Sequence, residues 1–297
     1  MPIYRLQRIS KHGFALITVI WSLGLLSLLV INFVITSHSQ RKIAHNMLES
    51  AKAEALANAG VRLAILDLVA TAKLLPEKWR FPHNGLPVTH YFNKNGCVEI
   101  SVHDEESKID LNTANEALLI ALFKSIGMDH QTASNHVDRM IDFRDYNNLR
   151  RVNGAEQSEY KTANLKFGPK NFIFQHVSEL DQVFGFSQTQ IRQITPLVTV
   201  HSKRSGLDFT LIPKTNLDKL AASTDQATLA QYNLASRKRV FSITAHAKTS
   251  SLGAFTRKTT IELTNENKNG FKILSWQKEK GLETSGASSI SHMTKVC

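Results

Sequence analysis

The chain has 297 residues, which is enough for one or two domains with their own hydrophobic cores. Its formal net charge of +11 suits nucleic acid, acidic lipid or acidic protein as a partner, but the lysines and arginines are scattered, so we assign most of them to a solvated surface. No Gly-x-Ser-x-Gly or His-Glu-x-x-His motif occurs and the 12 histidines are dispersed, so we do not expect an enzyme.

The first hydrophobic stretch, residues 14–35, contains no charged side chain. A helix of this length rises about 1.5 Å per residue and spans a hydrocarbon core of roughly 30 Å. A cleaved secretory signal is the alternative, but its apolar region usually has about 7–15 residues and ends at a small-residue site, whereas the polar residues 36–42 follow here. We therefore predict one transmembrane helix over 14–36. The basic leader before it modestly favours a cytoplasmic N-terminus.

The same helix is expected to continue past the membrane. Apolar residues recur at steps of four and then three, the spacing of one helical stripe, and good helix formers fill residues 49–68. Gly60 is an isolated interruption, and Pro76 follows the expected end near Leu75. The sequence predicts a single helix of about 60 residues whose second half buries this stripe: Met47, Ala51, Ala55, Ala59, Leu63, Leu66 and Val69.

Strand patterns occur on both sides of a helical block. The pair Asn95-Gly96 is a strong tight-turn signal and predicts a hairpin in the first group of strands. One antiparallel sheet with a helical domain inserted in its chain fits this order, and the polar tail from residue 278 is predicted to be disordered. The segments with a strand pattern are 88–92, 97–103, 240–247, 255–263 and 271–276.

The helical block contains two helical-hairpin units in tandem. The first opens near Asp110, and either Asn112 or Thr113 can cap its first helix, with Glu116 close to the capping-box position. The expected extents of the units are about 107–170 and 171–202, and a degenerate third start lies at 215–220.

Several segments, in one order, carry a family resemblance: GFALITVIW (13–21), AEALANAGVRLAILDL (53–68), EESKIDLNTANEALL (105–119), IDFRD (141–145), NGAE (153–156), VSELDQVFG (177–185), TPLVTV (195–200) and KILSWQ (272–277). Together they resemble the minor pseudopilin K family of type II secretion. The resemblance implies an α+β, pilin-like fold, in which the long N-terminal helix packs on an antiparallel sheet and a large α-helical domain of SAM-like hairpin units is inserted. It also implies a place at the tip of a periplasmic pseudopilus, where the protein would help to start assembly and export across the outer membrane, beside minor pseudopilins I and J.

With this resemblance the chain divides into six expected parts. They are a prepilin leader (1–13), a transmembrane helix (14–36), the first part of the pilin-like body (37–106), the inserted α-domain (107–235), the C-terminal strands of the body (236–277) and a disordered tail (278–297). The helix would anchor the protein in the cell inner membrane with a cytoplasmic N-terminus and a periplasmic body.

The resemblance also implies processing. In the family a prepilin peptidase cuts after a Gly between the basic leader and the apolar helix, and methylates the new N-terminal Phe. Gly13 and Phe14 occupy that boundary, and an uncleaved anchor is the alternative. Most pilins have Glu at the fifth mature position, where it offsets the N-terminal ammonium of a neighbouring pseudopilin. Here that position is Thr18, which is the K-type pattern and favours a subunit with nothing ahead of it in the filament.

The polar stretch between the helical units has oxygen ligands around Gly154. Calcium takes about six to eight oxygens, and the family's α-domain can bind it. We hypothesise a weak calcium site formed by Asp142, Asp145, Asn147, Glu156 and Glu159. As the alternative, the two aspartates are solvated or pair with one of three nearby arginines: Arg144, Arg150 and Arg151.

The two cysteines, Cys97 and Cys297, are enough for one disulfide in an exported body, and we state that pairing as a hypothesis. They are far apart in the sequence and form no metal-binding CxxC pair.

A membrane-anchored DNA-uptake receptor is the alternative from another functional class. Its helix-hairpin-helix domains also begin with a run such as DLNTA, and they hold phosphate through backbone N–H groups at a Gly-apolar-Gly turn. The second Gly is absent from both turns of this chain, which read Gly127-Met128-Asp129 and Gly185-Phe186-Ser187. Nucleic acid is therefore not expected as a partner.

Overall fold

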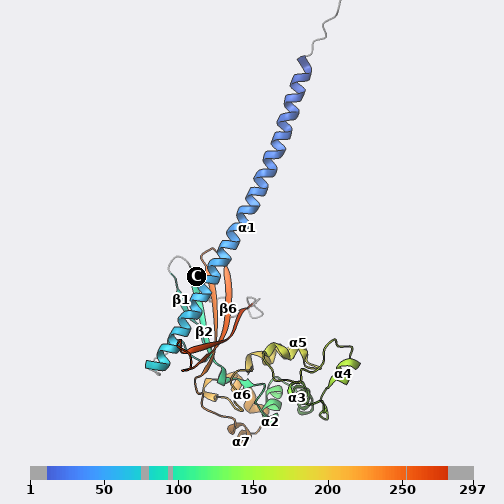
Figure 1. Cartoon of the computed structure of the whole chain (residues 1–297), viewed down its shortest axis with the longest axis vertical. Coiled ribbons are helices and arrows are strands. Elements are labelled where there is room, and N and C mark those ends of the chain that lie inside the picture. Colours follow the sequence, from blue (N-terminus) through green and yellow to red (C-terminus); the bar gives the residue numbers. More distant parts are fainter. Residues whose placement is uncertain (1–11, 75–79, 93–95, 252, 280–297) are drawn as a thin grey trace, which may run out of the picture.

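The computed structural model describes residues 12–74, 80–92, 96–251 and 253–279. Figure 1 shows a long straight helix whose C-terminal half lies on a β-sheet, and a helical domain at the end of the sheet that is farther from the N-terminus. The prepilin leader and the predicted disordered tail fall outside the described residues, apart from His12, Gly13 and residues 278–279.

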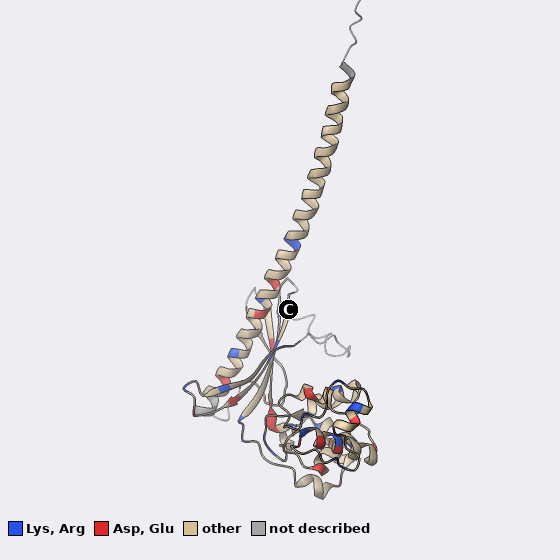
Figure 2. Cartoon of the chain, turned by 45° about the vertical axis from the view of Figure 1, so that its right-hand side comes forward, with Lys and Arg blue, Asp and Glu red and all other residues tan. Residues whose placement is uncertain are grey.

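The helix α1 (His12–Leu74) has 63 residues and confirms the predicted continuous helix. The part that begins at Phe14 is long and apolar enough to cross a membrane, with a mean hydropathy of 2.5 over its most apolar window. No Lys, Arg, Asp or Glu occurs between Phe14 and Gln40, and Figure 2 shows the first coloured charges only where α1 approaches the sheet. This segment makes no contact that buries it within the chain.

The predicted buried stripe of α1 is wrong. Met47 and Leu66 are 68% and 66% exposed, and Ala51 and Ala55 are exposed as well. The buried face is rotated around the helix and consists of Ala53, Ala57, Val61, Ala64, Ile65 and Leu68. Because the second half of α1 has alanines on both faces, periodicity alone could not choose between them, and contact with the sheet decides.

Gly60 lies on this buried face and lets α1 approach the sheet closely. A Cβ atom at Gly60 would lie 2.5 Å from Val98 Cγ1 and 3.3 Å from Ile100 Cδ1, whereas real side chains essentially never come closer than 3.0 Å. The residue that interrupts the helix pattern in the sequence is therefore the point of closest packing between helix and sheet.

We expect Gly60→Leu to destabilise the body by at least about 1–3 kcal/mol, because overpacking this contact must move a strand or the helix. The control is Ala55→Leu, which adds a larger side chain at an exposed position of the same helix. Urea unfolding of the chain from Gln40 onward measures both. Equal unfolding midpoints for the two variants would contradict the close approach.

The sheet has five antiparallel strands in the order β1-β2-β5-β6-β7. Their bounds are β1 (Val88–Tyr91), β2 (Gly96–Asp104), β5 (Val240–Thr249), β6 (Ala254–Leu263) and β7 (Phe271–Glu279). The neighbours β2 and β5 are far apart in the sequence, since the whole inserted domain connects them, and Asp104 is paired with Phe241 where the chain leaves and re-enters the sheet. With α1 packed on one face, this confirms the predicted pilin-like α+β fold.

The helix covers the apolar face of the three central strands. Val98, Ile100 and Val102 of β2 are fully buried, as are Ile243 and Ala245 of β5. Every second residue of these strands points to the opposite face, which is polar, so the alternation that predicted the strands also gives the orientation of the sheet. Among the described residues, these side chains and α1 form one hydrophobic cluster, separate from that of the inserted domain.

The inserted domain consists of short helices around its own core. Its α-helices are α2 (Glu116–Ser125), α3 (His130–Arg144), α4 (Gln157–Thr162), α5 (Gln188–Ile194), α6 (Lys214–Ser223) and α7 (Gln226–Ala230). Short stretches of 3-10 helix are η2 (Glu105–Ser107), η3 (Val177–Gln182), η4 (Thr195–Leu197) and η5 (Phe209–Leu211). A two-stranded parallel pair, β3 (Ile109–Asp110) and β4 (Val198–Thr199), joins the start of the domain to the end of its second unit.

The predicted cap of the first helix is wrong by two or three residues. Asn115, not Asn112 or Thr113, precedes α2, and its side chain accepts a hydrogen bond from Leu118 N. The carboxylate of Asp110 instead accepts from the backbone N–H groups of Asn112 and Thr113. The run that looked like a helix start is thus a turn held by an aspartate, a local bond that competes with helix formation.

Candidate functional site

The N-terminal part of α1 presents its side chains to the outside of the chain. Phe14 is 75% exposed, and Thr18 is also exposed. The Thr18 hydroxyl donates to Ala15 O at 2.9 Å, so its polar group is satisfied within the helix and needs no neighbouring charge. Cleavage between Gly13 and Phe14 and methylation of Phe14 stay predictions.

The point where the inserted domain joins the sheet is a buried ionic junction that the sequence did not reveal. Glu106 in η2 is completely buried, and its two carboxylate oxygens bind Arg204 Nη1 at 2.7 Å and Arg237 Nε at 2.9 Å. The two arginines also donate to the backbone carbonyls of Ala235 and Ser202. One carboxylate therefore ties together the outgoing chain, the returning chain and a loop of the inserted domain.

The neighbours of Glu106 support the same junction. The Asp104 carboxylate accepts from the Ser236 hydroxyl at 2.5 Å, and burial raises the pKa of Asp104 to about 6. Burial would also raise the pKa of Glu105, but Lys108 at 2.5 Å and the Thr199 hydroxyl reverse this and lower it to about 2. Three successive acidic residues are thus buried, each with its own partner.

The predicted calcium ligands lie in and beside the loop between α3 and α4, residues 145–156, which we call the acidic loop. Asp142 is in the last turn of α3 and Glu159 is in α4. Asp142 is fully buried and Glu156 is 5% exposed, and neither oxygen of Glu156 has a hydrogen-bond partner. Desolvation raises the pKa of Glu156 to about 7, and the negative charges of Asp142, Asp145 and Glu159 add to the effect. Gly154 keeps the loop close to Asp142, because a Cβ atom there would lie 1.8 Å from its Oδ2.

The other two predicted ligands make different bonds. Asn147 Oδ1 accepts from Leu149 N at 2.7 Å, inside its own turn. The Glu159 carboxylate accepts from Glu156 N at 2.9 Å and from the Ser158 hydroxyl, and it lies 3.6 Å from Arg150 Nε. Within the described ranges, no group of three or more His, Cys, Asp or Glu side chains has the arrangement of a metal site.

Of the three arginines, only Arg150 pairs with a predicted ligand, Glu159, and none of their side chains pairs with Asp142 or Glu156. The Arg144 guanidinium donates to Leu111 O, and Arg151 pairs with Asp138 at 2.6 Å and with Glu116 at 2.6 Å. Only the backbone N–H of Arg151 reaches Asp142. The solvated-or-paired alternative therefore leaves the buried carboxylate of Glu156 unexplained, and the calcium site stays a prediction.

The remaining predicted site concerns the cysteines. Cys97 is buried near the start of β2, and Cys297 lies outside the described residues, so their pairing stays a prediction.

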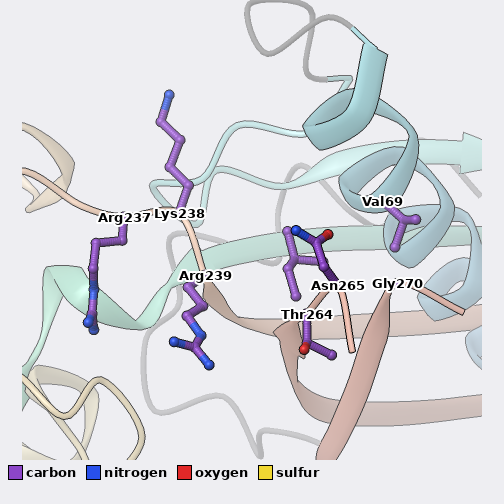
Figure 3. A pocket seen from close by; sticks show the side chains of 8 residues that line it. Val69, Arg237, Lys238, Arg239, Thr264, Asn265 and Gly270 are labelled. Carbon is purple, nitrogen blue, oxygen red and sulfur yellow. The ribbon is translucent and has the colours of Figure 1, made fainter. Parts of the chain in front are cut away.

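A cavity of about 280 Å³ lies between the end of α1 and the β6–β7 turn, and three consecutive basic residues line it (Figure 3). Arg237 is held by Glu106, and Arg239 pairs with Glu262 at 2.8 Å. In Figure 3 the side chains of Lys238 and Arg239 extend in opposite directions. Because these positive groups do not converge on one point, the cavity does not present the cluster of positive charge that an anion-binding site needs.

In the DNA-receptor alternative, phosphate would bind at the two hairpin turns, but in this chain side-chain caps already bind the N-termini of the helices that follow those turns. Asp129 caps α3 by accepting from Thr132 N at 3.0 Å, and Ser187 caps α5 by accepting from Gln190 N at 3.3 Å. A phosphate would need these N–H groups, and at Asp129 it would meet a carboxylate. The geometry of both turns therefore disfavours phosphate binding.

Residues 92–203 match the family model described as type II secretion system (T2SS), protein K. The matched range contains the sheet strand β2, Glu106 of the ionic junction and both helical units. This part of the chain is similar to protein K of type II secretion. The match confirms the resemblance inferred from the sequence. The acidic loop and Glu106 lie inside the matched protein K segment, whereas α1 and the last three strands lie outside it.

A solved structure extends the comparison to most of the chain. The GspK-GspI-GspJ complex from the type 2 secretion system of enterotoxigenic Escherichia coli contains a chain that matches with a TM-score of 0.58 and 18% sequence identity. The match covers 82% of this chain and 99% of that chain. At this identity the likeness supports the fold. No curated protein matches the chain.

Proposed function

We propose that the protein is a minor pseudopilin of K type, anchored in the inner membrane by α1 with its body in the periplasm. The observation that carries this proposal is the combination of a protein K segment with an uncovered apolar helix that begins at Phe14. The protein K match makes a secretion subunit more plausible than a DNA receptor, and the capped helix ends argue in the same direction. Its role is assembly rather than catalysis.

The expected partners are other pseudopilins. The solved relative is in complex with GspI and GspJ, and the likeness in fold over most of both chains supports the same partners here. The uncharged stretch from Phe14 to Gln40 offers a surface on which apolar helices of neighbouring subunits can pack, and a prepilin peptidase would process it first.

We place the protein at the tip of the pseudopilus, where it would help to start assembly and support export across the outer membrane. Thr18 supports this position. A subunit that follows another in the filament needs a carboxylate at the fifth position to offset an ammonium in an apolar surrounding, but the hydroxyl of Thr18 is satisfied by Ala15 O and offers no charge.

In-cell crosslinking from cysteines introduced at exposed positions of α1 tests the tip position. We expect crosslinks to other minor pseudopilins and one copy for each filament. Repeated self-crosslinks along the filament would contradict the tip position. Salt-dependent DNA binding by the same protein would revive the receptor alternative.

We further propose that the acidic loop binds one Ca²⁺ through Asp142, Asp145 and Glu156, with Asn147 and Glu159 completing the site if their side chains turn. Calcium would supply positive charge to the buried carboxylate of Glu156, which has no hydrogen-bond partner among the described residues. The carboxylates here are fewer than the oxygens that calcium takes, so we expect a weak site with a dissociation constant of about 10⁻⁴ to 10⁻³ M, the range of extracellular modules.

Calcium is expected to raise the melting temperature of the chain from Gln40 onward relative to chelator. The gain is about 2.7 kcal/mol when free calcium is about a hundred times the dissociation constant. The double variant Asp145→Ala/Glu156→Ala should lose the shift. Its control, Asp218→Ala/Glu266→Ala, removes two exposed carboxylates elsewhere and should keep it. A shift that survives in the first variant would place the ion somewhere else.

A further inference from the structure

Most of the large apolar side chains that the described residues expose beyond α1 belong to one stretch of the inserted domain. Leu149 and Val152 are 79% and 86% exposed. Large exposed apolar sets of this kind are uncommon on monomeric proteins and mark interaction sites. We name as the apolar loop patch the residues Tyr146, Leu149, Val152, Phe167, Phe172 and Ile173.

The loops that carry the patch are tied to each other. The rings of Tyr146 and Phe172 meet edge to face at 5.5 Å, and Asn171 Nδ2 donates to Asn148 Oδ1 at 2.6 Å. The ring of Phe167 lies 6.1 Å from that of the buried Tyr160 in α4. Figure 1 shows these loops around α4, at the end of the inserted domain away from the sheet. The segments around Tyr146 and Phe172 are therefore held side by side, and Phe167 is anchored on the core of the domain through Tyr160.

The exposed charges of the patch have one sign. Within residues 145–176 the Lys and Arg side chains classed as exposed are Arg150, Lys161 and Lys166, and Arg150, which is about half exposed, also lies 3.6 Å from Glu159. The acidic residues of the same stretch, Asp145 and Glu159 among them, are partly or wholly buried. Apolar groups rimmed by positive charge complement a surface on which apolar groups are rimmed by carboxylates.

The membrane that holds α1 is out of reach of the patch. At about 1.5 Å per residue, Ile35 and Val61 are separated by roughly 40 Å of helix, and the inserted domain lies beyond the far end of the sheet from the N-terminus (Figure 1). This separation favours a protein over the anchoring membrane as the occupant.

We propose that the apolar loop patch is a docking surface for a protein whose own surface presents aromatic or aliphatic side chains ringed by carboxylates. The central apolar side chains would provide most of the affinity, and Arg150, Lys161 and Lys166 would speed association and make it dependent on salt. This docking surface goes beyond the pseudopilin role and does not depend on the tip position.

The test uses the full chain in phosphatidylcholine nanodiscs and three labelled peptides of equal length. One alternates Trp and Leu with Glu, the second alternates the same apolar residues with Lys, and the third alternates Ser with Glu. Fluorescence anisotropy should show binding of the first peptide alone, and added salt should weaken it. Equal binding of the Lys peptide or of the Ser peptide would overturn the proposal.

The triple variant Leu149→Ser/Val152→Ser/Phe167→Ser should weaken binding of the Glu peptide at least about tenfold, since truncated central residues carry most interface energy. The control is Leu86→Ser/Ile273→Ser, which removes exposed apolar groups elsewhere and should bind like the unaltered chain. Equal affinities for the two variants would overturn the proposal. The full chain is also tested with vesicles that contain phosphatidylglycerol. If the triple variant loses vesicle binding but keeps peptide binding, the patch binds a lipid surface and the proposal is overturned.

Discussion

Replacing Glu106 by Ala is expected to lower the free energy of unfolding by about 3–5 kcal/mol, because the change leaves buried positive charge without its partner. The side chain of Arg204 is only 17% exposed and lies 2.7 Å from Glu106, so water cannot replace the lost carboxylate there. Arg237 is half exposed and should suffer less. The effect is thus expected to come mainly from Arg204.

Urea unfolding of the chain from Gln40 onward measures this effect. Glu266→Ala is the control, because it removes an exposed glutamate from the β6–β7 turn, and it should change the free energy by no more than about 0.5 kcal/mol. Glu106→Gln keeps the shape and some hydrogen bonds but not the charge, so it should fall between the two. If Glu106→Ala unfolds like the control, the junction does not hold the inserted domain on the sheet.

The second large effect is expected at the prepilin boundary, where the result is all or none. In cells with an active prepilin peptidase, mass spectrometry of the membrane form should find an N-terminus at Phe14 that carries a methyl group. Gly13→Leu should prevent cleavage, so that the purified membrane form still carries the leader, residues 1–13. The physical reason is that Gly13 has no side chain at the cut between the basic leader and the apolar helix, and a bulky residue would occupy the space of the peptidase site.

The control for processing is Gly24→Leu. Gly24 lies inside the same apolar helix, and a Cβ atom there would meet nothing within 4 Å, so this variant should be cut normally. An N-terminus at any other residue, or an uncut chain beside an active peptidase, would show that α1 is a plain anchor.

The long helix and the strands could be predicted because their signals are local. An unbroken apolar run and alternating side chains depend on near neighbours in the sequence. The face of α1 could not be predicted, since Ala51 and Ala55 are chemically the same as Ala53 and Ala57, which are buried. Contact with the sheet distinguishes the two faces, including the close approach of Gly60 to β2, and that contact is made by the tertiary structure.

The ionic junction was missed for the same reason. Glu106 sits in the acidic run 104–106, which in a sequence looks like solvated surface. Its partners Arg204 and Arg237 are 98 and 131 residues away in the sequence, and nothing local signals them. The one usable hint was that the acidic run follows directly on an alternating apolar strand, so its side chains had to begin at the edge of a core.

The acidic loop was predicted in part. Asp142 and Asp145 lie near enough to Glu156 for their negative charges to raise its pKa, and calcium binding by this cluster stays a prediction. The bonds of Asn147 to Leu149 and of Glu159 to the start of α4 were not foreseen, because they depend on the turn that the backbone adopts.

The central claim is that this chain is a K-type subunit that assembles with minor pseudopilins I and J. Co-expression of the three processed proteins, purification through a tag on this chain and native mass spectrometry test it most directly. We predict a complex with one copy of each subunit. A chain that purifies alone, or only with further copies of itself, while I and J are present and folded would contradict the claim.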